Sequence, residues 1–465
     1  MRHWIQIIPV IALLSAGACK MGEDYRRPDT PSQTDWRWKP AEPKDTVPRD
    51  GWWRIFGNQT LDDLIDRAQR GNFDLQAALA RVEMARATAR INRSDFFPSI
   101  EAPASFVRYR TSGNAPSPVP FPVPSFTQQQ WNIPFDLSYE VDLWGKIRRS
   151  FESAEHLAFA SEAARLSLQL TTQADIAASF FSAQALAEEI VLLRRAIELR
   201  KEALTIFEQR SAAGIGNEFE IHRGKVEVAA AEAELQAALR QQTQLHHALA
   251  ILTGSAPGDF GQVSFAGEII LPQVQPGLPS ALLERRPDVA QAERELASRL
   301  ALIGVAKTAY FPSLRLTASG GVLSGELTDL FEWDSRVWSF GPSLTIPIFH
   351  FGRAGANLAR ARAAYEEALA LYRQKILIAF REVEDNLAAL EFLGKETAAR
   401  MEAASAANVA GELSLARYRA GSINFLEVID SENVRLANER ARVRAINDQR
   451  LATVRLIKAL GGGWE

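Results

Sequence analysis

The stretch WNIPFDLSYEVDLWGK, residues 131–146, alternates large apolar side chains with polar ones along most of its length and then reaches a glycine. A period of two places the two kinds of side chain on opposite faces of a β-strand. Residues 146–213 follow without a glycine or a proline and predict one very long helix. At ~1.5 Å per residue such a helix would extend about 100 Å, which an ordinary globular domain does not need.

The composition limits the classes of protein. The chain has 465 residues, of which 47% are hydrophobic and 23% are charged, and a formal net charge of −3. This length suggests about two or three domains. The chain has no excess of basic residues of the kind that binds nucleic acid, so we expect no nucleic acid as a partner. Beyond the N-terminus, no uninterrupted apolar run reaches the ~18 residues of a membrane-spanning helix, so strands would have to span any membrane.

The first residues predict an export signal. Residues 1–18 combine a short basic start with an apolar run that ends in small residues before Cys19, the only cysteine. One cysteine excludes a disulfide within one copy and a cysteine metal cluster. The motif AGAC resembles a bacterial lipobox, with Ala16 where leucine is usual, and predicts a covalent lipid on Cys19 and no other cofactor. An incidental thiol is the alternative. Lys20, rather than aspartate, favours sorting to the outer membrane.

The next stretch is rich in proline and charge. Residues 19–59 predict an extended, lipidated tether rather than a packed domain. Apolar periodicity begins only at Leu61.

An internal duplication organises the rest of the chain. Pro98 matches Pro312, and farther along Gly145 matches Gly352 with an offset of 207 residues. The first repeat covers residues 60–270 and the second covers residues 271–465. Each repeat predicts two amphipathic strands followed by two long helices. The expected strands are about 100–110, 131–144, 314–323 and 338–349, and the expected long helices are 146–213, 217–253, 353–420 and 425–460.

Four strands in one chain raise a closure problem. Membrane barrels have no open edges and need an even number of strands from about 8 upward. Two copies would give eight strands and a filled interior, whereas three copies would give twelve strands and a lumen. The first long helix carries apolar residues in a 4,3 spacing that is interrupted at Arg200 and favours coiled-coil packing. A free-standing coiled-coil scaffold is the alternative.

Several motifs together resemble the outer membrane factor family, the TolC, OprM and NodT proteins. They are AGACK at 16–20, DYRRP at 24–28, WWRIF at 52–56, ARYRAGSINFLEVID at 416–430 and SENVRLANERA at 431–441. The resemblance implies a mixed, mostly α fold in which three chains form a 12-stranded β-barrel in the bacterial outer membrane. A long coiled-coil α-helical tunnel then continues into the periplasm.

The resemblance also implies a function and partners. The expected function is a passive exit duct of a tripartite multidrug or small-molecule efflux system, gated at its periplasmic tip. The partners would be two further copies, a periplasmic adaptor, an inner-membrane transporter of the RND type and outer-membrane lipid. An exit duct for type I protein secretion and a pore-less periplasmic coiled-coil adaptor remain as alternatives. The lipobox favours efflux, and the strands and duplication disfavour the adaptor.

The resemblance places a gate beside two turns. The turns contain Gly214 and Gly421, and the expected gate residues are Glu427, Asp430, Glu220 and Tyr418. Glu427 and Asp430 are three residues apart and share a helix face, so three chains would form rings of negative charge that select cations. The alternative is that these carboxylates only stabilise helix N-termini. Ile423 stands where the family has arginine, so an arginine latch between chains would need Arg417 or Arg419.

The opening stretch predicts a lipid-facing row and a water-facing row. Asp136, Glu140 and Asp142 are expected to line the lumen, with Trp131 and Trp144 near the ends of the strand where aromatic girdles occur. Pro134 cannot donate a hydrogen bond to a neighbouring strand and has no explanation at this level.

Catalytic chemistry finds no support. The six histidines show no HExxH spacing, and the adjacent His246 and His247 fit a helix surface better than a metal site. GIGNEF at Gly214 lacks the third glycine of a dinucleotide loop. We therefore expect neither an enzyme nor a metal site.

Overall fold

The structure is a computed structural model that describes residues 20–33, 35–37, 51–114, 124–265, 267, 269–272, 274 and 285–462. The expected signal peptide and Cys19 lie outside the described residues. The chain divides into two compact units. Unit 1 comprises Met1–Pro28, Val82–Ser161 and Ala292–Tyr372, and unit 2 comprises Asp29–Arg81, Glu162–Gln291 and Arg373–Glu465.

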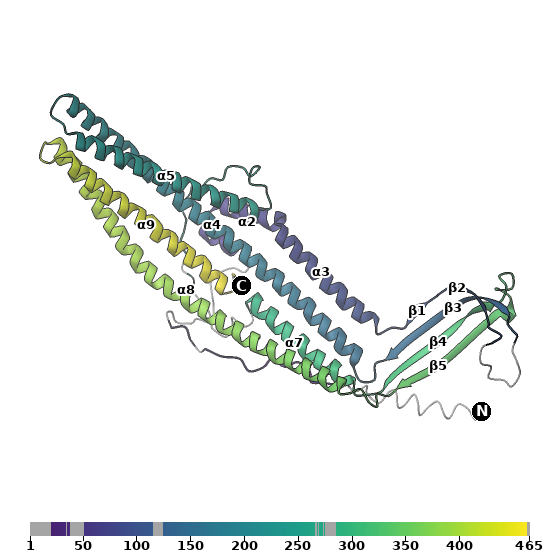
Figure 1. The fold of residues 1–465 in the computed structure, drawn as a ribbon. Helices are drawn as coiled ribbons and strands as arrows, with labels where there is room; N and C mark the ends of the chain where they lie inside the picture. Colours follow the sequence, from purple (N-terminus) through teal and green to yellow (C-terminus); the bar gives the residue numbers. More distant parts are fainter. Residues whose placement is uncertain are drawn as a thin grey trace. The chain divides into compact units, whose positions relative to one another are not determined.

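Unit 1 contains one antiparallel sheet (Figure 1). Its order is β1-β3-β4-β5, and β2 also pairs with β3. The strands are β1 Ser99–Glu101, β2 Ser105–Arg110, β3 Thr127–Val141, β4 Ser313–Ser324 and β5 Arg336–Thr345.

The strands β1 and β2 act as one interrupted strand. Glu101 pairs with Asp136 and Ser105 pairs with Asn132, so both strands keep one register along β3. The same register carried across the gap puts Pro103 opposite Pro134. Neither proline has an N–H for the ladder, which explains both the break and the tolerance of Pro134. The expected four strands are therefore present, the first with a gap.

Two strands end earlier than the sequence predicts. The strand expected to reach Trp144 ends at Val141, and the one expected to reach Phe349 ends at Thr345. Asp142 turns the chain into a helix, and Pro347 cannot continue a ladder.

The sheet has one apolar face, and much of it is exposed in the single chain. The register places Trp131 beside Ser324, Phe135 beside Gly320 and Leu137 beside Ala318, so the odd positions of β3 share a face with the even positions of β4. The even positions of β5 continue this face. Exposed side chains on it are Phe135, Trp338, Phe340 and Leu344, with Trp338 84% exposed. This face is therefore suited to contact an apolar environment or an apolar partner surface.

Paired helix lengths reproduce the duplication. The helices α4 Lys146–Ala212 and α8 Arg353–Arg419 each have 67 residues, and α5 Glu218–Leu252 and α9 Phe425–Ala459 each have 35. The shorter α3 Phe73–Ser94 and α7 Pro287–Thr308 each have 22. The remaining elements in the described part of the chain are α2 Gln59–Gly71, η1 Trp52–Phe56 and η3 Trp333–Ser335.

The helix α4 contains an apolar window that could span a membrane by length and composition alone. More than half of that window, 56%, is buried inside the protein. Phe180 and Phe181 of α4 are fully buried. This part of α4 is therefore the core of unit 2.

The expected unpacked tether is wrong for its described part. Trp52 and Phe56 in η1 are 1% and 0% exposed, and the Phe56 ring lies 4.9 Å from that of Phe181. The Trp52 indole N–H donates to Gln173 Oε1 at 3.0 Å. Trp36 is also buried and packs edge-on against Phe380 at 6.3 Å. Large aromatic side chains bury enough area to pack a proline-rich segment without any helical periodicity.

His156 of α4, in unit 1, makes a contribution to folding stability that depends on pH. Its Nδ1 is buried without a protein partner, and its ring lies 6.4 Å from that of Tyr25. Burial, helped by the charge of Arg294, lowers the pKa of His156 below its ordinary 6.5, although Glu152 and Glu155 oppose this. The folded chain therefore binds this proton less readily than the unfolded chain.

We expect this contribution to stability to be complete above about pH 6.5 and to be lost as the pH falls toward the folded pKa. Between pH 7.5 and 5, the melting temperature of His156→Gln should therefore fall less than that of the wild type. Circular dichroism melts measure it, with the exposed His222→Gln on α5 as the matched control. Equal falls in wild type and His156→Gln would contradict the assignment.

Candidate functional site

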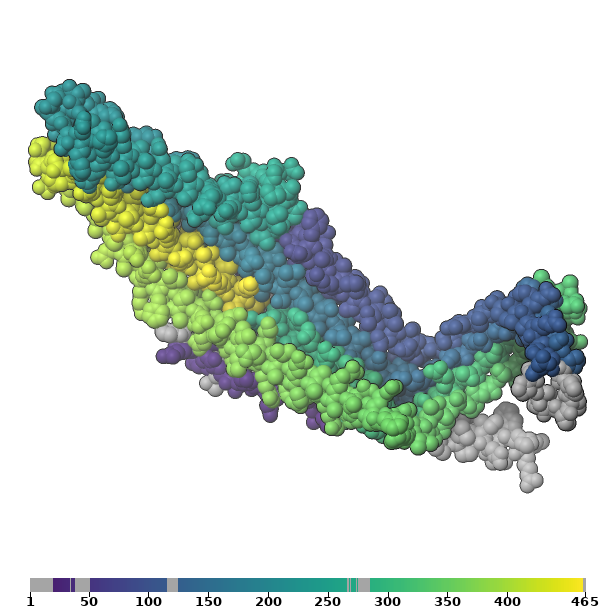
Figure 2. All heavy atoms as spheres, in the orientation of Figure 1, coloured from purple at the N-terminus to yellow at the C-terminus, as the bar shows by residue number. Residues whose placement is uncertain are grey.

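Two matching turns close the long hairpins of unit 2. Gly214 and Gly421 have φ of 75° and 73°, in the left-handed region that favours glycine. The N–H of Gly214 donates to Ser211 O at 3.0 Å, and that of Gly421 donates to Tyr418 O at 2.8 Å. Added side chains would meet nothing within 4 Å, so backbone conformation alone requires these glycines. Figures 1 and 2 show the two turns together at one end of this unit.

Asparagine side chains cap the helices that follow the two turns, and the carboxylates expected at the gate do not. Asn424 Oδ1 accepts the N–H of Glu427 at 3.1 Å, and Asn217 Oδ1 accepts the N–H of Phe219 at 2.9 Å. Glu427 and Glu220 lie in the first turns of α9 and α5, where negative charge is favourable. Their side chains are not required as caps and are available for another role.

Apolar packing orients α9 at the tip. The buried residues Phe207, Phe425, Val428 and Ile429 form one cluster with Ala203, and Tyr418 and Ile423 pack against it. The Tyr418 ring lies 4.8 Å from that of Phe425. The buried face of α9 is thereby fixed, and Glu427 and Asp430 both lie on its exposed face. The structure thus brings these two carboxylates onto one surface, as the spacing predicted, and places Tyr418 in the packing beside them.

Asp430 has a partner that sequence reasoning missed. Its Oδ1 lies 3.2 Å from Arg223 Nη2 of α5. The side chains are 64% and 38% exposed, so the pair stabilises the fold by at most about 1 kcal/mol. The signal was in the duplication, because Asp430 and Arg223 are 207 residues apart and occupy equivalent positions of the two repeats.

Glu220 differs from Glu427, its equivalent in the second repeat. Glu427 is exposed, whereas Glu220 is partly buried. Its Oε2 is buried and has no hydrogen-bond partner among the described residues. Of the three carboxylates expected at the gate, two are therefore exposed and one is partly buried.

A second group of charges links α4 to its neighbours farther from the turns. Glu189 is 7% exposed, and its Oε1 lies 2.6 Å from Arg440 Nη2 and 3.0 Å from Arg444 Nη2 of α9. Arg200 donates to Asn433 Oδ1 at 2.6 Å and to Glu227 O at 3.2 Å. The arginine that interrupts the apolar spacing of α4 thus connects α4 to both α9 and α5.

The three carboxylates expected in the lumen are not equivalent. Asp136 lies within β3, opposite Ser319. Glu140 also lies in β3, but its Oε1 forms an ion pair with Lys146 at 2.9 Å, and Arg315 is opposite it in the ladder.

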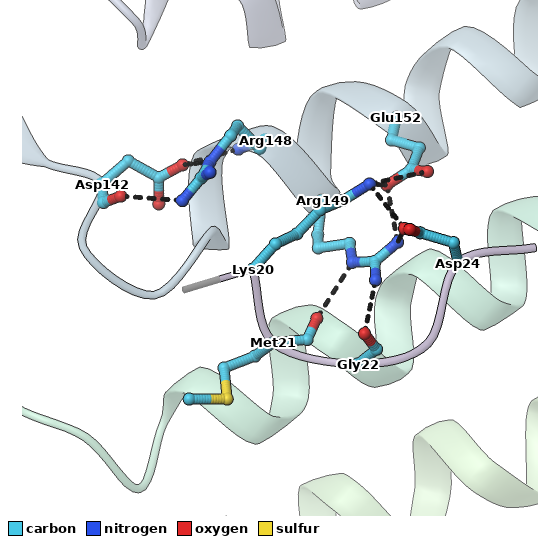
Figure 3. Close-up of polar contacts among 8 residues, drawn as sticks. All are labelled: Lys20, Met21, Gly22, Asp24, Asp142, Arg148, Arg149 and Glu152. Carbon is cyan, nitrogen blue, oxygen red and sulfur yellow. Dashed lines mark hydrogen bonds and ion pairs between the residues drawn. The ribbon is translucent and has the colours of Figure 1, made fainter. Parts of the chain in front are cut away.

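Asp142 has a structural role that the sequence analysis did not predict. Asp142 lies beyond the end of β3, and its oxygens accept the N–H groups of Ile147 at 3.1 Å and Arg148 at 3.0 Å. Figure 3 shows Asp142 against Arg148. It also pairs with the Arg148 side chain at 3.0 Å and is 12% exposed. A carboxylate at a helix N-terminus satisfies otherwise unpaired N–H groups, so Asp142 caps α4.

The expected girdle residue Trp144 is engaged inside unit 1. Its indole N–H donates to Pro312 O at 2.7 Å, and its ring lies 4.7 Å from that of Phe311.

Within the described parts of the chain, no group of three or more histidine, cysteine or acidic residues could hold a metal ion.

Comparisons with known proteins agree with this geometry. The family model described as "Outer membrane efflux protein" matches residues 64–255 and 278–462. The chain is 34% identical to the outer membrane protein OprJ of Pseudomonas aeruginosa, over 98% of this chain and 95% of OprJ. It is 33% identical to the solvent efflux pump outer membrane protein SrpC of Pseudomonas putida, over 98% of each. The solved Campylobacter jejuni CmeC outer membrane channel is 26% identical, with a TM-score of 0.90 over 96% of each chain.

Proposed function

Because the chain belongs to the outer membrane efflux protein family, we propose that three copies form one exit duct for small molecules, with a barrel in the outer membrane and a helical tunnel in the periplasm. Outer-membrane location and a channel-type fold are established by the relatives. The trimer, the gate and the tripartite assembly are the steps that we add. In this proposal the chain is a conduit and carries out no catalysis.

The observation that carries the proposal is the sheet of unit 1. Its order leaves β5 on one edge and the interrupted β1 and β2 on the other. Unpaired strand edges are not stable in lipid, so the edges must pair with strands of other copies. Three copies of this four-strand arrangement supply twelve strands and a lumen. The exposed apolar face, with Phe135, Trp338 and Phe340, then faces lipid.

The tip of unit 2 supports a gate. Glu427 and Asp430 lie on the exposed face of α9, which in the proposed trimer faces the shared axis with six carboxylates. Rings of like charge in a narrow passage select cations. Glu220 and Tyr418 shape the surface beside these rings, and Gly214 and Gly421 form the turns.

The proposed partners follow from the family. SrpC is named as the outer membrane protein of a solvent efflux pump, which favours efflux of small molecules over protein secretion for this chain as well. An adaptor in the periplasm and an RND-type transporter in the inner membrane would deliver the substrates.

Purified protein in planar bilayers tests the duct. We expect discrete single-channel currents and a native mass of three chains. A pore-less adaptor would give neither currents nor insertion. Deletion of the gene separates the two duct functions, since loss of efflux leads to accumulation of small apolar compounds, whereas loss of secretion leaves a protein inside the cell.

The lipid on Cys19 is a separate prediction. In cells grown with labelled palmitate, we expect label on the wild-type chain and none on Cys19→Ser, because a thioether-linked lipid needs the sulfur. Trimers should still form in Cys19→Ser. Label that persists in this variant would show that Cys19 is not the lipid attachment site.

A further inference from the structure

The first described residues lie against backbone that leaves no room for side chains. A methyl group on Gly304 of α7 would lie 2.7 Å from Met21 O, and one on Gly145 would lie 3.1 Å from Lys20 Cα. Gly22 has a φ of +89°, and a methyl group on it would lie 3.0 Å from Gly304 Cα. Gly304 therefore has no room for a side chain, and Gly22 and Gly145 combine tight contacts with a positive φ that favours glycine. Gly145 and Gly304 thus form a slot for the start of residues 20–28, the N-terminal segment, in which Gly22 itself lies.

Arg149 of α4 holds the N-terminal segment through its backbone. The Arg149 side chain is 2% exposed. Its Nε donates to Met21 O at 2.9 Å and its Nη2 donates to Gly22 O at 2.7 Å, while its Nη1 donates to Glu152 Oε2 at 2.9 Å (Figure 3). A buried guanidinium is costly unless its donors are used. All three nitrogens contact the segment, because Nη1 also lies 3.3 Å from Asp24 Oδ1.

Further contacts attach the segment at both of its ends. Lys20 Nζ lies 2.9 Å from Asp24 Oδ1 and 3.2 Å from Glu152 Oε2. At the other end, Arg27 donates to both oxygens of Glu293 on α7, at 3.1 and 2.9 Å. The bidentate pair fixes orientation as well as position.

The slot is next to the place where the sheet becomes a helix. Met21 N–H donates to Trp144 O at 3.0 Å. Asp142, directly after β3, caps the first turn of α4, and Arg149 is the fourth residue of the same helix (Figure 3). The contacts that hold Met21 in place therefore also connect it to the residues that follow β3.

We propose that Arg149, Gly145 and Gly304 form a seat for the N-terminal segment of the chain, which fixes its position at the junction of β3 and α4. The seat recognises backbone carbonyls and works without a lipid. A lipid on the residue before Lys20 then enters the membrane beside the base of the sheet. This consequence for the lipid rests on the proposed lipidation of Cys19, whereas the seat does not.

A spin label on the segment tests the seat. Glu23 is exposed, and Glu23→Cys in the Cys19→Ser background provides a single thiol for a nitroxide in the full chain. Electron paramagnetic resonance of the trimer in nanodiscs reports the mobile fraction. We expect an immobile label when Arg149 is present. Arg149→Met removes two charged hydrogen bonds and should increase the mobile fraction about tenfold or more.

Gly22→Val gives an independent test that leaves the helices unchanged. It should also release the label, because its side chain has no space against Gly304. Matched controls are Arg26→Met, exposed in the segment, and Arg165→Met, whose partners Glu162 and Gln169 are on α4 itself. Both should keep the label immobile.

Three results would overturn the seat. The first is a label that stays immobile in both Arg149→Met and Gly22→Val. The second is a control variant in which the label becomes as mobile as in Arg149→Met. The third is a label that is already mobile in the Cys19→Ser background with the slot intact. The last result would mean that the lipid holds the segment. Palmitate labelling of Arg149→Met with Cys19 present should equal that of the wild type, so failure of lipidation is distinguished from failure of the seat.

Discussion

Single-channel conductance of the Glu427→Ala, Asp430→Ala double variant should exceed that of the wild type several-fold, and its cation preference should fall. The two carboxylates lie on the exposed face of α9, and the apolar cluster around Phe425 holds the opposite face in place. Removing both side chains takes six negative charges from the tip of a trimer and widens the passage. Because like charges at a constriction attract cations and exclude anions, selectivity changes together with conductance.

Two further variants make this experiment specific. Glu402→Ala with Glu412→Ala removes the same charge from exposed positions of α8 and should leave both quantities near wild type. Arg223→Gln removes the partner of Asp430 but keeps the carboxylates, so cation preference should be retained or rise. The gate assignment is wrong if the double variant behaves as wild type in planar bilayers.

The Glu189→Ala variant should lose about 3 kcal/mol of unfolding free energy, the largest effect on stability that we expect. Glu189 is nearly buried and receives Arg440 and Arg444 from α9. Without it, Arg440 keeps Glu234 as its acidic partner among the described residues, while Arg444 is 62% exposed and can turn to water. The loss therefore falls at the lower end of the range for a broken buried pair.

Thermal denaturation measured by circular dichroism checks this prediction. A loss of this size lowers the melting temperature by several degrees. The neighbouring Glu188→Gln, at an exposed position of the same helix, is the control and should melt near wild type. An unchanged melting temperature in Glu189→Ala would show that the two arginines are sufficiently hydrated without the carboxylate.

The architecture was predictable because its signals are local. Alternation in residues 131–146 identified a strand, and the absence of glycine and proline in residues 146–213 identified a helix. The observed α4 ends at Ala212, one residue before the expected end. The repeat offset placed Gly214 and Gly421 in matching turns, and the structure gives them nearly equal φ angles.

Strand ends and the tether were less predictable. Alternation continues past Val141 in the sequence, but the cap at Asp142 stops β3 there. The N-terminal region has no periodicity, yet Trp36 and Trp52 are buried. Both outcomes depend on a helix end or a surface that a local pattern does not describe.

By itself the sequence determined the duplication, the four amphipathic strands, the long helices and the family, because each depends on spacing along a short stretch of chain. Only the tertiary structure decided which charges meet. Arg223 with Asp430, Arg440 with Glu189, and Arg149 with the backbone of Met21 join positions more than one hundred residues apart. Such partners are set by how the helices pack against one another, and a local pattern carries no information about that packing.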